Sequence, residues 1–427
     1  MIQHPTFRRS VAPCASSAAN IGVPWRRLAG LMLALLLLVT GAGGASADAA
    51  GKRWVESFWP TAKKAGISRS VYDNALGNFT PDPDVLAKAK NQAEFVKPLW
   101  EYLDGAISQK RLENGKTALR DYSRQLGAIE AAYGVDRYTV VAIWGMESSY
   151  GQVLQNDKIV KNAIRSLATL AYQGGSRAKY GRQQLIAALK ILQRGDITVR
   201  GMSGSWAGAM GHTQFIPTTY QAYAVDFDGD GRRDIWNSEV DALASTANYL
   251  AKMGWRGGET WGYEVELPAG FDWRLADEGK SAPLSQWRKL GIHRVAGRQF
   301  PNSNEAARLY TPAGAGGPAF LLLPNFRVIK RYNNADAYAL AVGHLSDRLR
   351  GGGSFVSGWP RDVRPLSAGE RAELQQLLAR RGLYKGSYDG KVGPGTKKAI
   401  RDYQRQAGLI PDGYASTGLL QRLRSGA

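Results

Sequence analysis

The chain has 427 residues, of which 44% are hydrophobic and 22% are charged. This composition is typical of a globular protein, and the length is enough for roughly two or three domains. The only cysteine is Cys14, which excludes disulfides within the chain and zinc sites built from thiolates. The formal net charge of +20, from 56 basic and 36 acidic residues, indicates a polyanionic partner: nucleic acid, an anionic polymer of the cell envelope, or a membrane surface.

Residues 1–47 have the three parts of a secretory signal. Arg26 and Arg27 precede an apolar run at residues 28–39, and a small-residue site follows, so we expect cleavage near Asp48. The apolar run is short for a bilayer span, which makes an uncleaved anchor the weaker alternative. The two arginines match a twin-arginine signal only loosely, and the export route stays open.

Export narrows the choice of partner. Cleavage would remove four arginines and no acid, which leaves 20 − 4 = +16 on the mature chain. Cys14 lies ahead of the apolar run, so no lipobox is seen, and we expect a periplasmic protein that is soluble or loosely associated with the envelope. For such a protein a wall polymer or a membrane surface is a better partner than nucleic acid, which we do not expect it to bind.

The region after the signal is predicted to be mainly helical. Apolar residues recur at helical spacing, most clearly at Leu185, Leu189 and Leu192. The helices expected in this region cover residues 85–126, 129–134, 136–146, 179–194 and 241–253.

A small β-sheet is predicted to interrupt the helices at about residues 257–331. Residues 261–267 alternate as a half-buried strand does, and short apolar runs separated by Gly/Pro turns follow. The further strands are expected at 307–310, 319–323 and 326–331. With a closing helix at 335–349, one domain with an inserted sheet would span residues 48–350.

The last part of the chain is predicted to form a separate module. Glycine and serine begin an expected flexible linker at residues 351–365. Residues 366–427 then show apolar residues at helical spacing and Asp-Gly turns, which predicts three short helices. The predicted fold class is therefore mainly α, with a small inserted sheet and a C-terminal three-helix module.

One carboxylate stands at the end of the apolar run at residues 140–151. Held against apolar walls, Glu147 would have a raised pKa and would keep a proton at neutral pH, as a general acid must. Gly145 and Gly151 would let other backbone or a ligand come close. The alternative is a solvated glutamate at a helix end.

The stretch at residues 203–217 is dense in small residues. Its glycines suit either close backbone packing or the floor of a cleft, and Ser205 and Gln214 could hydrogen-bond sugar groups. His212 lacks a Ser, Cys or second His at motif spacing, so we do not expect it to be catalytic.

Acidic residues at alternate positions predict a cation site. They match the start of an EF-hand loop, with the required glycine at position 6 but an asparagine at position 12. Without a cation the three aspartates would repel each other; a solvated acidic turn is the alternative. We expect a structural calcium or sodium ion held by Asp226, Asp228, Asp230, Arg232 (through its carbonyl), Asp234 and Asp241.

The stretch at residues 331–334 is predicted to follow a strand and precede a helix. The ring of Tyr332 and the amide of Asn333 suit stacking on a sugar and hydrogen bonding to it. A turn with an asparagine cap is the common alternative.

Together these segments resemble the B-type (family 3) lytic murein transglycosylases, which cut the glycan strands of peptidoglycan. The resemblance covers most of residues 50–350 and rests on several motifs in the same order. It includes Glu-Ser-Ser-Tyr-Gly at 147–151, Ser-Trp-Ala-Gly-Ala-Met-Gly-His-Thr-Gln-Phe-Ile-Pro at 205–217, the Asp-rich loop, Ala-Asn-Tyr-Leu at 247–250 and Arg-Tyr-Asn-Asn at 331–334.

The resemblance implies a lysozyme-like helical fold with a small appended sheet. It makes Glu147 the single catalytic acid and base, and it makes the C-terminal unit a peptidoglycan-binding module. It implies that substrate is bound by Ser205, Gln214, Tyr249, Tyr332, Asn333, Tyr338 and Tyr102. No cofactor is implied for catalysis, and we expect a monomer whose partners are glycan strands and other cell-wall enzymes.

The implied reaction needs no water. Glu147 would protonate the oxygen between N-acetylmuramic acid and N-acetylglucosamine, and the C6 hydroxyl of the muramyl residue would then close a 1,6-anhydro ring. A muramidase on the same fold, in which water attacks, is the nearest alternative. A wall-binding protein without turnover is the alternative from another class.

Overall fold

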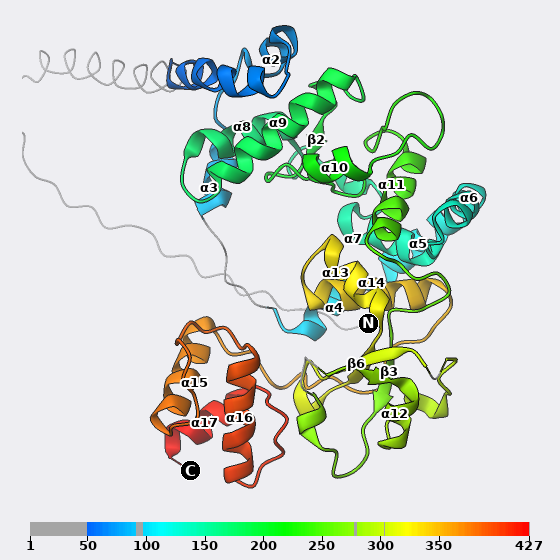
Figure 1. Cartoon of the computed structure of the whole chain (residues 1–427), viewed down its shortest axis with the longest axis vertical. Coiled ribbons are helices and arrows are strands. Elements are labelled where there is room, and N and C mark those ends of the chain that lie inside the picture. Colours follow the sequence, from blue (N-terminus) through cyan, green and yellow to red (C-terminus); the bar gives the residue numbers. More distant parts are fainter. Residues whose placement is uncertain (1–48, 91–96, 277–279, 303, 427) are drawn as a thin grey trace, which may run out of the picture. The chain divides into compact units, whose positions relative to one another are not determined.

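The computed structural model describes residues 49–90, 97–276, 280–302 and 304–426 (Figure 1). The predicted secretory signal at residues 1–47 lies outside these described residues. Within the described ranges, no helix has the length and apolar character needed to cross a membrane.

Helices make up most of the structure between residues 49 and 252. A first helix covers residues 49–64. The others are α2 (Arg69–Leu76), α3 (Pro83–Lys90), α4 (Leu99–Ala106), α5 (Gln109–Asp121), α6 (Ser123–Tyr133), α7 (Arg137–Ser148), α8 (Ala163–Gln173), α9 (Ala178–Arg194), α10 (Pro217–Tyr223) and α11 (Glu239–Lys252), with the short strands β1 (Lys161–Asn162) and β2 (Ser203–Gly204) paired between α7 and α10.

The expected helix at 85–126 is divided into several. α4 begins directly after Pro98, which cannot donate a backbone hydrogen bond. α5 begins after Ser108, whose hydroxyl accepts from the backbone N–H of Arg111 as an N-cap. Apolar spacing continued across these breaks, but the proline and the capping serine set the boundaries.

α7 is the central helix of the core. The Asp136 side chain caps its start, and every residue from Thr139 to Gly145 is buried. α7 packs against α5, α6, α11 and α14 (Asp336–Leu349). Full burial of each large aliphatic side chain contributes about 1.5–3 kcal/mol, so this helix is firmly held.

The inserted sheet has five antiparallel strands in the order β4-β6-β7-β3-β5. Its strands are β3 (Gly262–Glu266), β4 (Ala282–Pro283), β5 (His293–Arg294), β6 (Ala306–Tyr310) and β7 (Ala319–Leu322). In the register, Leu321 of β7 faces Tyr263 of β3 and Leu309 of β6. These side chains form a separate apolar core with Trp287 of α12 (Leu284–Lys289).

The strand expected at residues 326–331 is wrong, because this segment forms α13 (Pro324–Tyr332). Proline at the first helical position fits a helix start, where its missing N–H costs nothing. Phe326 and Ile329 are buried one helical turn apart. Three apolar residues within a six-residue segment fit either a strand or a helix, and the proline was the signal that distinguished them.

Residues 351–365, predicted as a flexible linker, make contacts along much of their length; we call this segment the strap. The Phe355 ring stacks on His344 of α14, with centroids 3.7 Å apart. The Glu264 carboxylate of β3 accepts from the backbone N–H groups of Val356 and Ser357. Glycine and serine at its start suggested a free tether, whereas the aromatic side chains after them are packed.

Further contacts hold the second half of the strap. Trp359 lies against Trp100 of α4, with ring centroids 6.2 Å apart. The Arg361 guanidinium donates to both carboxylate oxygens of Asp104, at 2.7 and 3.0 Å. The strap is thus fastened to α4, α14 and the inserted sheet.

The C-terminal part contains the three expected helices. They are α15 (Ala368–Arg380), α16 (Pro394–Gln406) and α17 (Thr417–Ser425), and α15 begins with a capping box formed by Ser367 and Glu370. Their apolar faces make a core of their own, which includes Leu374, Ile400 and Leu420.

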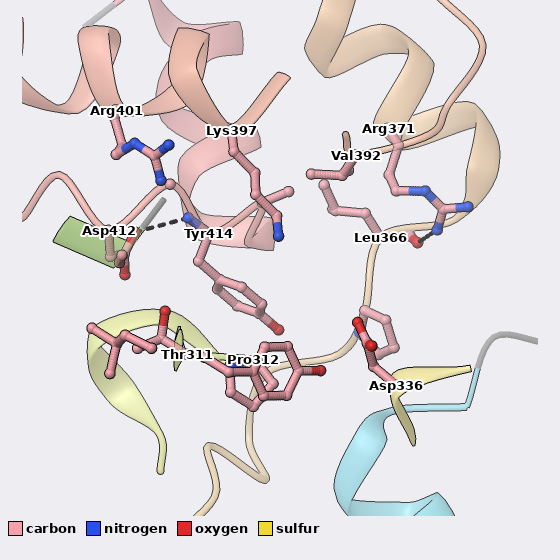
Figure 2. Close-up of a pocket in the computed structure, with 16 residues that line it drawn as sticks. Thr311, Pro312, Asp336, Leu366, Arg371, Val392, Lys397, Arg401, Asp412 and Tyr414 are labelled. Carbon is pink, nitrogen blue, oxygen red and sulfur yellow. Dashed lines mark hydrogen bonds between the residues drawn. The ribbon is translucent and has the colours of Figure 1, made fainter. Parts of the chain in front are cut away.

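This C-terminal part contacts the loop between β6 and β7. The Asp412 carboxylate accepts from the backbone N–H of Ala315 at 2.9 Å. Beside this contact lies a cavity of about 280 Å³, into which Lys397 and Tyr414 point from one wall opposite Pro312 (Figure 2). The loop between α16 and α17 therefore touches the loop between β6 and β7.

Candidate active site

The last turn of α7 carries Glu147, whose side chain is half-buried. The Tyr338 hydroxyl of α14 donates to Glu147 Oε1 at 2.6 Å. Burial raises the pKa of Glu147 to about 7, and the Tyr338 hydrogen bond opposes that rise because it favours the charged form. A carboxyl group that titrates near neutral pH can both give and take a proton, as general acid–base catalysis requires.

The chain turns sharply after this helix. Ser149 and Tyr150 both have positive φ, at 53° and 59°, a conformation that costs a non-glycine residue roughly 1–2 kcal/mol. Gly151 follows with φ 85°. The turn therefore needs support from surrounding contacts to stay in place.

Side chains, not a ligand, fill the space that the two motif glycines leave. A Cβ on Gly145 would overlap with the ring of Tyr150, and a Cβ on Gly151 would overlap with the ring of His212. Tyr150 lies edge-on to Trp144, with ring centroids 5.6 Å apart. The glycines let two rings pack under the turn that presents Glu147.

Three predicted tyrosines lie near the carboxylate, and a fourth packs against one of them. Besides Tyr338, Tyr332 at the end of α13 and Tyr102 on α4 have pKa values raised by burial and, secondarily, by the charge of Glu147. Tyr249 of α11 lies edge-on to Tyr332, with centroids 5.2 Å apart, and donates to the Arg331 carbonyl at 2.5 Å. The structure thus brings together residues from α4, α7, α11, α13 and α14.

Ser205 and Gln214 shape the segment at residues 203–217. The Ser205 hydroxyl oxygen accepts from the backbone N–H groups of Ala207 and Ala209, at 3.3 and 3.1 Å. Gln214 has φ 54°, and its amide donates to the Gly211 carbonyl at 2.9 Å. Both side chains are half-buried and hold their own loop in shape.

The glycines of this segment serve close packing. A Cβ on Gly211 would overlap with the Ile235 carbonyl oxygen, and one on Gly208 with Leu167. The Thr213 carbonyl accepts from the Tyr332 hydroxyl at 2.6 Å, which places the segment beside the tyrosines around Glu147.

Asn333 is exposed, and its backbone N–H ends α13 by donating to the Ile329 carbonyl. The expectation that residues 331–334 follow a strand is wrong, because they close a helix.

His212 has a structural position. Its Nδ1 accepts from the Trp144 indole N–H at 3.0 Å, and burial lowers its pKa. The expectation that His212 is not catalytic stays a prediction.

Sequence reasoning missed Arg111, a half-buried residue of α5. Its guanidinium contacts the last turn of α7, where it donates to the Gly145 carbonyl at 3.0 Å. An arginine on an amphipathic helix gives no signal in the sequence that separates such a role from a solvated surface position.

The Asp-rich loop brings three of its predicted ligands together. Carboxylate oxygens of Asp226, Asp228 and Asp230 lie within 4.8 Å of one another. Asp226 also accepts from the N–H groups of Gly229 and Gly231, at 2.8 and 2.9 Å, and Gly231 has the positive φ of 89° that this turn requires. Three converging carboxylates suit a hard cation such as calcium or sodium.

Asp234 and Asp241 do not join that group. The Asp241 carboxylate accepts from the backbone N–H groups of Phe227, Asp228 and Asp234, and burial raises its pKa to about 6. Asp234 accepts from the N–H groups of Trp236 and Asn237. In this structure both side chains lie outside the three gathered carboxylates and accept from backbone amides. Their role as ligands stays a prediction.

The end of the loop holds the segment that carries Ser205 and Gln214. The Ile235 carbonyl accepts from the His212 N–H at 2.9 Å, and the Trp236 indole N–H donates to the Ser203 carbonyl at 2.9 Å. The candidate metal loop and the wall of the candidate site are thus one connected structure.

Two family models match the chain. The model of the transglycosylase SLT domain matches residues 50–347, and that of a peptidoglycan binding domain matches residues 367–423. The chain is also 32% identical over 301 residues to the membrane-bound lytic murein transglycosylase B of Escherichia coli K12, across 67% of this chain and 79% of that protein.

Solved structures are similar as well. SltB3 of Pseudomonas aeruginosa, in complex with NAG-anhNAM-pentapeptide, matches with a TM-score of 0.83 and 51% identity, covering 88% of this chain and 99% of that one. The lytic transglycosylase Slt35 of Escherichia coli, in complex with calcium, matches with a TM-score of 0.58 and 28% identity, covering 70% and 92%.

Proposed function

Because this chain belongs to the transglycosylase SLT domain family and is a peptidoglycan lytic transglycosylase, we propose that it cleaves the bond between N-acetylmuramic acid and N-acetylglucosamine without consuming water. The product would carry a 1,6-anhydro ring on its muramyl end. The observation that carries this proposal is the half-buried Glu147, with a pKa of about 7 and a hydrogen bond from Tyr338.

Glu147 would act first as an acid and then as a base. In its protonated form it gives a proton to the bridging oxygen, and the bond from that oxygen to the muramyl C1 breaks. Positive charge develops at C1, assisted by the acetamido group of the substrate. Glu147 then takes the proton from the C6 hydroxyl, whose oxygen bonds to C1 and closes the ring.

A single carboxylate is enough for this reaction. Glycoside hydrolases that use water or an enzyme nucleophile need a second carboxylate about 5–9.5 Å away. In the proposed reaction the C6 hydroxyl of the substrate takes the place of that water or enzyme nucleophile, so Glu147 alone would serve as acid and base.

We further propose that the tyrosines around Glu147 and the segment with Ser205 and Gln214 bind the glycan. Tyrosine rings suit stacking on sugar faces, and the Ser205 hydroxyl keeps a proton to donate while its oxygen accepts two backbone bonds. Exposed Asn333, next to Tyr332, would add a side-chain amide.

At the Asp-rich loop we propose a structural calcium or sodium ion. Asp226, Asp228 and Asp230 would hold it with the Arg232 carbonyl. Such an ion would neutralise the three clustered charges, and Asp234 and Asp241 would support the loop through its backbone amides. The proposed reaction at Glu147 does not involve it.

The chain carries a peptidoglycan binding domain, and we propose that residues 366–427 use it to hold the enzyme on the wall. Residues 48–350 would form the catalytic domain and residues 351–365 the connection. Residues 1–47 would direct export to the periplasm, where the substrate lies. The basic charge would then serve an anionic wall polymer and not nucleic acid.

The proposal is tested by mass spectrometry of the sugars released from purified peptidoglycan by residues 48–427. The unmutated protein should give anhydromuramyl ends, and Glu147→Gln should give none while still binding, because it removes the transferable proton at nearly constant shape. Reducing ends would identify a muramidase. Absence of products with the unmutated protein would favour a wall-binding protein.

A further inference from the structure

One guanidinium joins three parts of the chain beneath the candidate site. Arg111 donates through Nε to the Gly145 carbonyl at 3.0 Å, and through Nη1 to the carbonyls of Gly105 and Ala106, both at 2.8 Å. Its Nη2 lies 3.5 Å from the Ser149 hydroxyl. The C-terminal ends of α4 and α7 are thereby bound to α5.

The carbonyls that Arg111 reaches lie at helix ends, where many backbone acceptors lack partners within the helix. A positive charge is favourable at such an end. The Gly145 carbonyl also accepts the Ser149 N–H that closes α7. Arg111 therefore acts at the turn where the chain enters its left-handed conformation.

Tyr150 also holds this turn in place. Its hydroxyl donates to the Arg111 carbonyl at 3.0 Å. Its ring occupies the space beside Gly115 of α5 and Gly145 of α7, where a Cβ on either glycine would overlap with it. The strained residue and the arginine are thus connected to each other as well as to α7.

We propose that Arg111 and Tyr150 are positioning residues, which hold the last turn of α7 against the ends of α4 and α5 and so fix the Glu147 carboxylate in its reactive place. Neither needs to touch substrate. Because α4 carries Tyr102 and α7 carries Glu147, the same contacts set the distance between these two side chains. This inference rests on the function proposed for Glu147.

Arginine suits this position and lysine does not. The planar guanidinium sends donors in several fixed directions, and here it meets carbonyls from two helix ends at once. A lysine ammonium would supply charge without that fork. Arg111→Lys therefore separates the effect of charge from that of geometry.

The test compares Arg111→Met, Arg111→Lys and Tyr150→Phe with the unmutated full chain on a soluble glycan oligosaccharide. We expect kcat to fall about ten- to hundred-fold in both Arg111 variants, with KM within about two-fold, since small misplacements of reacting groups cost this much. Tyr150→Phe keeps the ring and loses one hydrogen bond, so its kcat should fall less. A looser turn would let water reach Glu147, lower its pKa, and move the alkaline limb of the pH profile to lower pH.

Arg165→Met is the matched control. The Arg165 guanidinium of α8 also bridges backbone carbonyls, those of Thr80 and Pro81, but it does so away from Glu147. This variant should keep both kcat and the pH limb. Thermal unfolding of each variant shows what fraction is folded, so a simple loss of stability is corrected for.

Several results would overturn the inference. A rise in KM with unchanged kcat would mean that Arg111 contacts substrate, and full activity in Arg111→Lys would mean that its charge alone matters. If Arg111→Met does not fold, the other two variants decide. An unchanged kcat and an unchanged alkaline limb of the pH profile in Arg111→Lys and Tyr150→Phe would reject the positioning role. An unmutated protein that releases no product would reject the proposed function instead, before any variant is compared.

Discussion

Two opposing influences act on the Glu147 carboxyl group. Burial favours the neutral acid, and the hydrogen bond from Tyr338 favours the carboxylate. Since the acid is needed to begin the proposed reaction, the rate should be full below the pKa of about 7 and should fall as the pH rises through it.

Tyr338→Phe should therefore move the alkaline limb of the kcat/KM profile to higher pH, because it removes the contact that lowers the pKa of Glu147. The profile on a soluble glycan, measured from pH 5 to pH 9, checks this. Tyr332→Phe is the control, since the Tyr332 hydroxyl donates to the Thr213 carbonyl and not to Glu147. A limb that stays in place or moves to lower pH in Tyr338→Phe would contradict the assignment.

For single residues, the sequence predicts a role when the signal for it lies in the neighbouring residues. The apolar run around one carboxylate suggested a raised pKa for Glu147, which the structure has. The run by itself fitted a solvated glutamate at a helix end at least as well, and the motifs further along the chain were needed to choose between the two. Its partner Tyr338 lies 191 residues further along the chain. No spacing rule connects the two, and only the resemblance to a family pointed to Tyr338. Arg111 gave no signal of either kind.

Among the elements, the Asp-rich loop and the segment at residues 203–217 depend on each other. Ile235 and Trp236 at the end of the loop make hydrogen bonds to both parts of that segment, at His212 and at Ser203. A cation that stabilises the loop would also stabilise the wall of the candidate site.

Calcium should raise the melting temperature of the unmutated protein and should not raise that of a variant with Asp226→Ala and Asp228→Ala. The reason is that ligand binding to the folded state alone adds to its stability. Thermal unfolding with calcium and with a chelator measures the effect. Asp157→Ala, an exposed aspartate outside the loop, should still respond. An equal calcium response in all three proteins would reject this site.

Element types followed from apolar spacing where the pattern was long, as in α9, α11 and α14. The prediction failed where the pattern was short. The apolar residues within residues 326–331 fit a strand as well as a helix, and Pro324 favours the start of a helix. In the Asp-rich loop, spacing found the three gathered aspartates. It could not show that Asp234 and Asp241 turn to backbone amides, because that depends on how the chain folds back.

In the whole molecule, the strap is held against α4, α14 and the inserted sheet more tightly than its composition suggested. We expect Phe355→Ala with Trp359→Ala to make residues 351–365 an easy target for proteases, because the loss of both rings removes the packing on His344 and Trp100. Limited proteolysis followed by mass spectrometry locates the cuts. Val356→Ala is the control, since that side chain is 59% exposed. Equal cleavage rates in the double variant and the unmutated protein would show that the strap needs neither ring.

Deletion of residues 366–427 should weaken binding to isolated wall sacculi and leave the cleavage of short soluble glycans intact. The three C-terminal helices have an apolar core of their own, so their removal does not open the core around α7. Sedimentation with sacculi and product analysis measure the two properties separately. Loss of both would mean that the C-terminal part is needed for the catalytic fold itself.

A strap held by contacts limits how far the C-terminal module can move from the part of the chain that carries Glu147. A free chain of this length would have an end-to-end distance of about 20 Å and would let a wall-binding module search a wide volume around the cleft. Contacts from Phe355 to Arg361 remove most of that freedom. If both surfaces bind glycan as proposed, avidity would be gained only by strands whose path suits both surfaces at once. The strap would then select substrates by strand geometry as well as by chemistry.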